Sequence, residues 1–252
     1  MKRWIVTRRN TLDSTQAEAR RRCAAGLSAK TAILADCQTA GRGRGNRAWE
    51  SAAGKGLWLS LILPVAAPLE TLAQSTLVLA AAVREAAERA SGVDLRIKWP
   101  NDLLHDGRKC CGLLAEADAQ ANMRAPGMPA PVSLILGIGL NVNHLEDDFP
   151  ESLRQTATSL RIVSGQECSR ERILRHVLRS ADRWFGLWTK KGFEPVRAAW
   201  LAANCTLGKR IVLPCGYGYA QGTARDLAPD GALVVLADDG ALVRVDAGEI
   251  GL

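Results

Sequence analysis

The sequence predicts an α+β protein in which a mixed β-sheet with flanking helices is followed by a small C-terminal β-barrel. Two observations support this. Up to about residue 205, short segments rich in Leu, Ile and Val alternate with longer segments whose apolar residues recur every three or four positions. Beyond that point, short strand-like segments separated by turn signals follow one another. The chain is therefore predicted to divide into domains at residues 1–205 and 206–252.

Three segments have the pattern of helices. The first begins at Asp13, Ser14 and Thr15, because short polar side chains can accept hydrogen bonds from the free N–H groups of the first turn, and it ends near Gly26. The other two have core-facing residues spaced as on one side of an amphipathic helix. These positions are Leu69, Leu72, Thr76, Ala80 and Val83 in one segment, and Ile173, Val177, Ala181, Trp184 and Trp188 in the other.

The predicted strands are short and apolar, and Gly or Pro bounds most of them. In the large domain they cover residues 31–36, 56–63, 94–99, 112–116 and 132–142. Residues 119–131 lack periodicity and are predicted to form a surface excursion between two antiparallel strands. In the small domain the strands cover residues 209–213, 219–227, 232–237 and 241–245, with turns at 229–231 and 238–240.

Composition limits the class of protein more than the function. The chain has 252 residues, 47% of them hydrophobic, and a formal charge of +7, which permits nucleic acid binding without establishing it. Its seven cysteines form no C-x-x-C pair, so reduced thiols in a cytoplasmic protein are expected rather than disulfides or a zinc site. No signal peptide or membrane-spanning segment is expected.

The most informative motif is a basic, glycine-rich loop at residues 38–49, directly after a predicted strand. Gly41, Gly43 and Gly45 alternate with arginines, so backbone N–H groups and planar guanidinium groups could converge on a phosphate or a carboxylate. The spacing is not that of a Walker loop. A flexible basic surface loop would have the same composition.

Two further segments carry polar groups next to strands. Residues 98–116 place Lys98, Asp102 and Lys109 around a hairpin turn at Asp106 and Gly107, where lysine could stabilise developing negative charge and the carboxylate could face Mg²⁺ or a ribose. Structural ion pairing is the alternative. Residues 136–143 end a strand with glycines at alternate positions, which would suit either a flat ligand or close helix packing.

Together these motifs resemble the catalytic domain of biotin-protein ligases, in the order typical of that family. The resemblance covers nearly the whole chain and implies that the C-terminal barrel is SH3-like. Two positions depart from the family pattern. Gln16 stands where Asn is common, and Asn46 stands where the loop commonly has Gly, although Asn tolerates left-handed backbone better than most residues.

The resemblance implies roles for individual residues. Polar groups would bind the ureido ring of biotin, small and apolar groups would wall its ring and chain, and the basic loop would wrap the adenylate. The implied biotin site comprises Ser14, Thr15, Gln16, Gln38, Gly41, Arg42, Gly43, Arg44, Trp58, Lys109, Gly112, Leu114 and Gly139. The implied ATP site comprises Arg42, Arg44, Arg47, Trp49, Asn101, Asp102, Lys109 and Asn141. Catalysis is assigned to Arg44, Lys109, Asp102 and Lys98, with Asp102 also a ligand to Mg²⁺.

The implied activity is ATP-dependent formation of biotinyl-5′-AMP and transfer of biotin to a lysine of a biotin carboxyl carrier protein. A lipoate-protein ligase, a biotin-responsive DNA-binding repressor and a pure binding module are the alternatives. Thirteen residues precede Ser14, too few for a helix-turn-helix module, so we expect no specific DNA among the partners. Because no membrane-spanning segment is expected, we expect no membrane among them either. A side-by-side homodimer is compatible with exposed edge strands.

Overall fold

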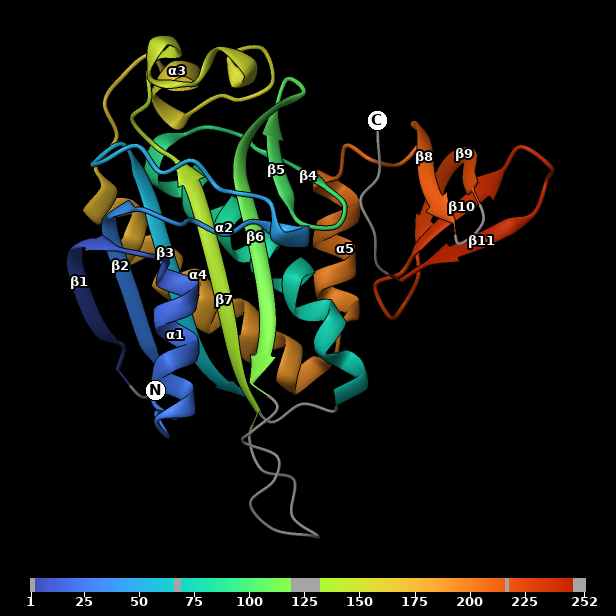
Figure 1. Ribbon diagram of the computed structural model, residues 1–252. Helices are drawn as coiled ribbons and strands as arrows, with labels where there is room; N and C mark the ends of the chain where they lie inside the picture. The colour runs from blue at the N-terminus through green and yellow to red at the C-terminus, as the bar shows by residue number, and fades with distance from the viewer. Residues whose placement is uncertain (1–2, 66–68, 119–131, 216–217, 247–252) are drawn as a thin grey trace, which may run out of the picture.

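The computed structural model describes residues 3–65, 69–118, 132–215 and 218–246. It contains a seven-stranded sheet with helices on both faces and, beside it, a four-stranded C-terminal sheet (Figure 1). The fold class expected from the sequence is therefore confirmed. In the part of the chain that the structure describes, no helix is long and apolar enough to cross a bilayer.

The large sheet is mixed. At one edge, the strands Ile5–Leu12 and Thr31–Gln38 are parallel, and all other neighbouring pairs in this sheet are antiparallel. In spatial order the strands are β1 (Ile5–Leu12), β2 (Thr31–Gln38), β3 (Gly56–Val65), β7 (Val132–Asn141), β6 (Arg108–Asp118), β5 (Asp102–His105) and β4 (Arg96–Lys98). Strands β6 and β7 are antiparallel, as predicted, while the excursion expected at residues 119–131 lies outside the described residues.

The two faces of the sheet carry different layers. Helix α1 (Thr15–Ala24) packs on one face, and α2 (Ser75–Ser91), α4 (Arg170–Lys191) and α5 (Glu194–Ala203) lie on the other (Figure 1). Alternate side chains of β3 point into the two layers. Leu57, Leu59 and Leu61 join the large core under α2 and α4, whereas Ser60 and Ile62 face the side of α1.

The layer under α1 is small. Its apolar cluster consists of Ala19, Cys23, Ile33, Ile62 and Ile135, all buried. Because α1 covers only part of that face, polar and glycine positions of β3, β6 and β7 beyond the helix stay available to line a cavity. On the opposite face, α2, α4 and α5 pack over the buried leucines and valines of the large core.

The C-terminal sheet is antiparallel, in the order β11 (Leu242–Val245), β10 (Leu233–Ala237), β9 (Gly218–Leu227) and β8 (Arg210–Cys215). Its turns match the predicted ones: Gly231 and Gly240 have φ of 95° and 87°, which glycine adopts most readily. Hydrogen bonds tie the β4–β5 turn to this region. Trp99 donates its Nε1–H to the Gly231 carbonyl at 3.2 Å and its backbone N–H to Thr206 Oγ1 at 2.9 Å.

Several elements differ from the expectation. The helix expected across residues 69–83 is a 3₁₀ turn (Leu69–Gln74) followed by α2, which starts at Ser75. Strand 94–99 is shorter than predicted, and the chain returns as β5, which was not predicted. Strand β1, the short α3 (Leu160–Ser164) and α5 were also missed. Strand β1 is exposed over most of its length and carries charged residues, so it lacks a clear apolar alternation.

Candidate active site

One cavity of about 1500 Å³ opens on the face that α1 leaves uncovered. It is bounded by the start of α1, the loop between β2 and β3, the strands β4 to β7 and the segment after β7. Of the residues singled out from the sequence, the cavity brings together Ser14, Thr15, Gln16, Gln38, Gly41, Arg42, Gly43, Arg44, Arg47, Trp49, Lys98, Asn101, Asp102, Lys109, Gly112, Leu114, Gly139 and Asn141. Trp58 does not line it and is fully buried.

The start of α1 presents polar groups at one end of the cavity. Ser14 is the N-cap, as expected, and its Oγ accepts a hydrogen bond from the Ala17 N–H. Thr15 donates from both its backbone N–H and its hydroxyl to Gln38 Oε1, at 2.8 and 3.1 Å. Gln38 in turn donates to Ser51 Oγ at 3.0 Å. The helix start, the end of β2 and the following loop are thereby joined by side-chain hydrogen bonds.

Gln16 lies deeper in the fold, and its side-chain amide makes hydrogen bonds to other residues of the protein. Its Nε2 donates to Glu116 at 2.9 Å and to the Ile135 carbonyl at 3.2 Å, while its Oε1 accepts from the Ser60 hydroxyl at 2.9 Å. Arg20 also donates to Glu116, from Nε at 2.9 Å. Gln16 therefore lines the cavity with its amide already hydrogen-bonded to the protein, and the hydrogen bond to a ureido ring expected for it stays a prediction.

The basic loop is folded upon itself. Gly43 donates its N–H to the Arg47 carbonyl at 2.8 Å, and Trp49 donates its N–H to the Gly41 carbonyl at 2.9 Å. The left-handed position is Gly45, with φ of 65°, so the expected tolerance of Asn46 for that conformation is not what shapes the turn. Because the N–H groups of Gly43 and Trp49 are used inside the loop, they are not free to bind an anion.

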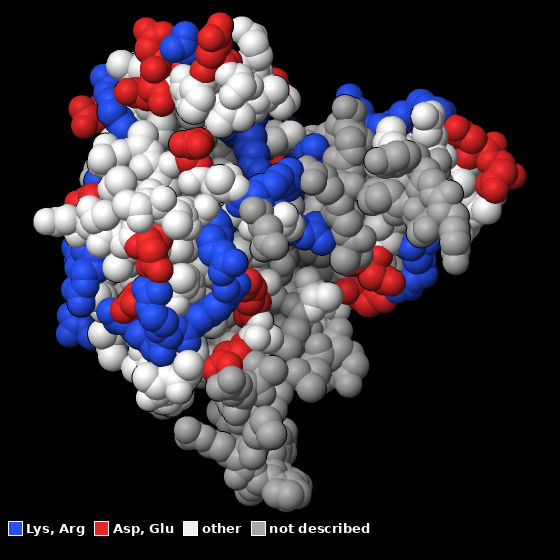
Figure 2. Space-filling view, viewed as in Figure 1, with Lys and Arg blue, Asp and Glu red and all other residues white. Residues whose placement is uncertain are grey.

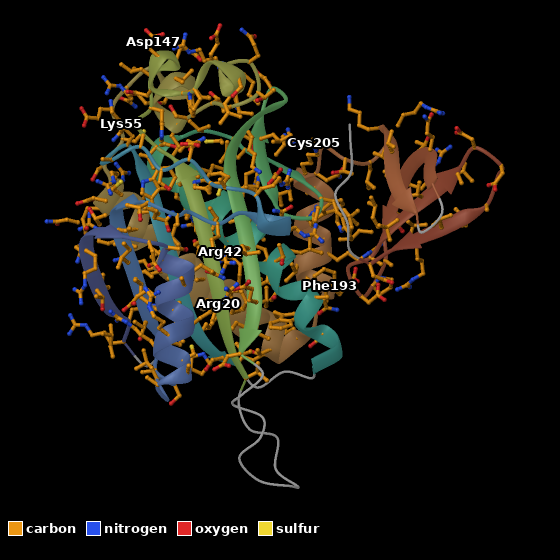
Figure 3. The ribbon with its side chains drawn as sticks, in the orientation of Figure 1. Arg20, Arg42, Lys55, Asp147, Phe193 and Cys205 are labelled. Carbon is orange, nitrogen blue, oxygen red and sulfur yellow. The ribbon has the colours of Figure 1, made fainter. Side chains whose placement is uncertain are left out.

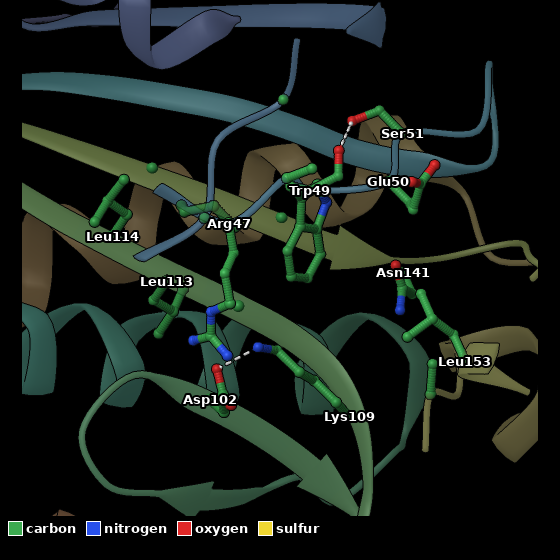
Figure 4. Close-up of a pocket in the computed structure, with 18 of the residues that line it drawn as sticks. Arg47, Trp49, Glu50, Ser51, Asp102, Lys109, Leu113, Leu114, Asn141 and Leu153 are labelled. Atoms are coloured by element: carbon green, nitrogen blue, oxygen red, sulfur yellow. Dashed lines mark hydrogen bonds and ion pairs between the residues drawn. The ribbon is translucent and has the colours of Figure 1, made fainter. Parts of the chain in front are cut away.

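The hairpin of β5 and β6 holds the ammonium and carboxylate pair that the sequence indicated. Asp106 and Gly107 form the turn, with φ of 46° and 79°. Lys109 Nζ lies 2.7 Å from Asp102 Oδ1 (Figure 4). Lys98 of β4 is the register partner of Asp102 in β5. Asn101 donates its side-chain N–H to the Leu113 carbonyl at 3.0 Å, which fixes the approach to the hairpin.

Gly112 and Gly139 form a patch of bare backbone that we call the glycine floor, since they pair directly across β6 and β7. The indole of Trp49 lies flat against it: a Cβ added to Gly112 or Gly139 would stand 2.6 or 2.5 Å from indole carbons. Trp58 packs behind Trp49, with ring centroids 6.3 Å apart at 68°. The flat group on Gly112 and Gly139 is therefore an aromatic side chain of the chain itself. Gly137, the other alternate glycine of β7, faces helix α1 instead, since a Cβ added there would stand 2.8 Å from Gln16 Oε1.

The segment after β7 forms another wall, which was missed in the sequence. His144 is buried, with its ring stacked on Phe149 at a centroid distance of 4.8 Å and at right-angled contact with Trp58. Burial lowers the pKa of His144 to about 4, so the ring is neutral near pH 7. The pKa of Asp148 is also lowered, by hydrogen bonds from the Leu145 N–H and from Lys55.

The cavity lining carries more basic than acidic side chains, although Glu50, Asp102, Asp106, Asp147 and Asp148 also line it. Side chains of Lys and Arg gather around the hollow in the middle of the molecule (Figure 2), and those that line the cavity are Arg42, Arg44, Arg47, Arg96, Lys98, Lys109 and Lys209. Arg42 and Arg20 both lie in front of β6 and β7 (Figure 3) and border a smaller pocket beside the main one. Such a surface favours anionic ligands such as phosphates and carboxylates.

A resident metal site is not apparent in the described parts of the chain. They contain no group of three or more His, Cys, Asp or Glu side chains arranged to hold an ion. Asp102 is a carboxylate at the cavity wall, and it is already paired with Lys109. Mg²⁺ is commonly held by one or two carboxylates together with substrate phosphates and water, so Asp102 fits an ion that arrives with a nucleotide better than a permanent one.

Several supporting residues escaped the sequence reasoning. Ser60, Ser51 and Glu116 hold Thr15, Gln16 and Gln38, and His144 and Phe149 form a wall. A signal existed for Ser60, a hydroxyl at a position of β3 whose neighbours are buried and apolar. For Glu116 and His144 no signal in the sequence distinguishes them from ordinary polar residues.

Comparisons with known proteins match both parts of the chain. Residues 9–125 match the Biotin/lipoate A/B protein ligase family, and residues 206–252 match the Biotin protein ligase C terminal domain. A curated relative, the "Bifunctional ligase/repressor BirA" of Bacillus spizizenii, is 37% identical over 83% of this chain, which spans 62% of that protein's length. The "Biotin--[acetyl-CoA-carboxylase] ligase" of Paracoccus denitrificans is 33% identical, with 94% of this chain and 96% of that protein covered.

A solved structure has the same architecture. The biotin protein ligase from Aquifex aeolicus, in complex with biotin and ATP, superposes with a TM-score of 0.82 at 30% sequence identity. The match covers 98% of this chain and 97% of that one. It therefore includes the large sheet, its helices and the C-terminal sheet.

Proposed function

The chain belongs to the biotin protein ligase family, and from that premise we propose that it activates biotin with ATP and transfers the biotinyl group to a lysine of a biotin carboxyl carrier protein. The observation that carries the proposal is the union, in one cavity, of a polar end at α1, an uncharged glycine floor and the Lys109–Asp102 pair beneath a loop of arginines. The match of residues 206–252 to a biotin-ligase domain favours biotin over lipoate.

In the proposed binding mode the ureido ring meets the polar end. Ser14, Thr15 and Gln38 supply donors and acceptors there, since only placed polar groups can recognise a small neutral ring. Gln16 supports this end from below through Ser60 and Glu116. The bicyclic ring and its chain run over Gly112, Gly139 and Leu114, and the carboxylate points toward Lys109.

The first step forms the mixed anhydride. A biotin carboxylate oxygen attacks the α-phosphorus of ATP, a new oxygen–phosphorus bond forms, and pyrophosphate leaves with the electron pair of the broken bond. Lys109, held by Asp102 at 2.7 Å, stabilises negative charge on the transferring phosphoryl oxygens. Arg42, Arg44 and Arg47 approach from the loop and bind the nucleotide phosphates, with Lys98 at the same wall.

The second step transfers the acyl group. The neutral amine of an acceptor lysine attacks the biotinyl carbonyl carbon, the carbon–oxygen bond to AMP breaks, and the amine loses a proton as the amide forms. Transfer is direct, so the protein has to orient the adenylate and exclude water. The assignment of Trp49, Asn101 and Asn141 to the nucleotide is part of the proposal, with Mg²⁺ accompanying ATP and Asp102 as the carboxylate nearest to it.

Location and assembly are also proposed. Buried thiols such as Cys110 and Cys111, whose pKa values burial raises, behave as small apolar side chains and suit the reducing cytoplasm. A side-by-side homodimer through exposed edge strands stays a prediction, as does the division of the chain into domains 1–205 and 206–252.

Two experiments test the proposed function. Exchange of labelled pyrophosphate into ATP should require biotin, which separates an adenylating enzyme from a binding module. In thermal unfolding, biotin with MgATP should protect the protein far more than lipoate with MgATP, by about 4 kcal/mol when the ligand is a thousandfold above its Kd. Equal or greater protection by lipoate would overturn the choice of substrate.

A further inference from the structure

The glycine floor is the part of the cavity best suited to a flat ring. Gly112 and Gly139 face each other across β6 and β7, and neither carries a Cβ that would hold a ring away from the backbone. Leu114, two residues along β6, lines the cavity beside them. In the proposed function this surface takes the bicyclic ring and chain of biotin, so the inference below rests on that proposal.

Trp49 already covers the floor. Its indole lies so close to Gly112 and Gly139 that a single added carbon on either residue would stand within 2.6 Å of it. Nothing as thick as a second ring fits between indole and backbone. Trp58 closes the space behind the indole, with the two rings 6.3 Å apart. The indole and a biotin ring therefore cannot occupy the glycine floor together.

The contact leaves the indole polar group unsatisfied. Within the described residues, Trp49 Nε1 is buried and has no hydrogen-bond partner. A buried N–H without an acceptor costs free energy, so this site does not complement indole as a dedicated indole site would. Trp49 is also carried by the basic loop, whose bonds from Gly43 to Arg47 and from Trp49 to Gly41 lie within the loop itself. The loop can move without breaking those bonds.

Lys109 links the indole to the reacting groups. Its Nζ lies 5.3 Å from the centroid of the Trp49 ring, within the range of a cation–π interaction, and 2.7 Å from Asp102. While the indole covers the floor, part of the Lys109 ammonium therefore faces an aromatic ring. When the indole leaves, that face is exposed to a carboxylate or phosphate.

We propose that Trp49 is a built-in competitor of biotin: it occupies the glycine floor in the ligand-free enzyme and has to move off before the biotin ring binds. The apparent affinity for biotin is then reduced by the fraction of molecules in which the floor is uncovered. Because the same movement exposes Lys109, biotin entry and preparation of the reacting ammonium are one event. Trp49 thereby controls how fast biotin is admitted.

The decisive test follows Trp49 directly. Protein labelled with 5-fluorotryptophan gives a fluorine NMR signal for Trp49, identified by its absence from Trp49→Phe. Saturation with biotin alone should shift this signal and make it sensitive to exchange of H₂O for D₂O. Retention of radiolabelled biotin is measured on the same sample. Retained biotin with an unmoved Trp49 signal overturns the inference alone, whereas no retained biotin overturns the proposed function.

Binding kinetics provide a second readout. In rapid-filtration experiments without ATP, the observed rate for wild type should level off as biotin is raised, because uncovering of the floor becomes limiting. For Trp49→Ala it should rise linearly and be roughly tenfold faster at low biotin. Trp4→Phe, a tryptophan beside Lys30 and away from the cavity, is the control and should match wild type. A linear wild-type response that Trp49→Ala does not accelerate contradicts the proposal.

Discussion

The cavity has two sides that are built differently. On the sheet side, Lys109 is held by strand pairing of β5 with β6, by its own N–H donating to the Thr156 carbonyl at 2.7 Å, and by the ion pair with Asp102. On the loop side, Arg42, Arg44 and Trp49 belong to a segment whose backbone bonds are mostly internal. Groups on a sheet stay fixed while a reaction proceeds, whereas groups on a loop can move to admit and retain a ligand.

This difference suggests a division of labour. The sheet side should determine how fast the adenylate forms, and the loop side should determine how long it stays bound. Variants on the two sides should therefore change different steps.

Lys109→Ala should slow adenylate formation by about 10²–10³-fold, as is typical when one preorganised group that stabilises developing charge is removed. Release of biotinyl-AMP, once formed, should change much less. Rapid-quench measurement of adenylate formation with excess enzyme gives the rate. Lys109→Arg retains the positive charge in a different geometry, so its rate of adenylate formation should fall between those of wild type and Lys109→Ala. A wild-type rate for Lys109→Ala would remove this residue from the chemical step.

Arg44→Ala should form the adenylate at a rate closer to wild type but release it faster. Losing a charge-assisted hydrogen bond costs roughly 1.5–3 kcal/mol, which corresponds to about a 10- to 150-fold change in retention. Chasing labelled biotinyl-AMP with unlabelled adenylate measures the release rate, and leaked adenylate should appear as biotin on lysines of bystander proteins. If Arg44→Ala holds the adenylate as tightly as wild type, the loop does not act as a clamp.

His144 tests whether the wall after β7 behaves like the rigid side. Its pKa is about 4 in the folded protein, mainly through burial, against about 6.5 when unfolded, while Asp148 raises it and Lys55 lowers it. The stability that the fold gains by keeping His144 neutral is complete above the unfolded pKa and is lost as pH falls toward 4. Urea unfolding should therefore give about 2 kcal/mol less stability at pH 5 than at pH 7 from this group.

The variant His144→Phe keeps a flat ring against Phe149 but cannot titrate. Its loss of stability between pH 7 and pH 5 should be smaller than that of wild type by about 2 kcal/mol, because the two proteins have all other titrating groups in common. The same loss in both proteins would mean that His144 is not held neutral by the fold.

Ser60→Ala should have the smallest effect. Its hydroxyl lies 2.9 Å from Thr15 Oγ1 and from Gln16 Oε1, so its removal should lower the free energy of unfolding by about 1 kcal/mol, the usual net value of one buried hydrogen bond. Ser180→Ala, a buried serine of α4 in the opposite layer, is the matched control. Equal losses in the two variants would show that the network under α1 adds nothing specific to the biotin side.

Much of the fold could be predicted because it follows from local patterns. The continuous apolar runs of β3 and β7, the polar residues that start α1 and the turns at Gly231 and Gly240 are properties of a few neighbouring residues. Strand β1 and helix α5 were missed for the same reason. The first carries charges along an exposed edge, and the second is a helix of only ten residues, of which Val196, Trp200 and Ala203 are buried.

The site was predicted residue by residue, but its contacts were not. Nothing in the spacing of the chain shows that Trp49 meets Gly112 and Gly139, so these glycines were predicted to contact biotin and Trp49 to contact ATP. Gln16 is held by Glu116, a hundred residues away, which sequence order cannot show. Trp58 has the alternation of a cavity-facing residue, yet the Trp49 side chain covers it.

Central to this account is the transfer of biotin through an adenylate that the sheet side makes and the loop side retains. Its most direct test is incubation of the protein with biotin, MgATP and a biotin carboxyl carrier domain, followed by intact mass. The account predicts one biotinyl group on one lysine of the carrier domain, absent without ATP and nearly absent with Lys109→Ala. A carrier domain that stays unmodified with biotin, or that gains a lipoyl group more readily, would contradict it.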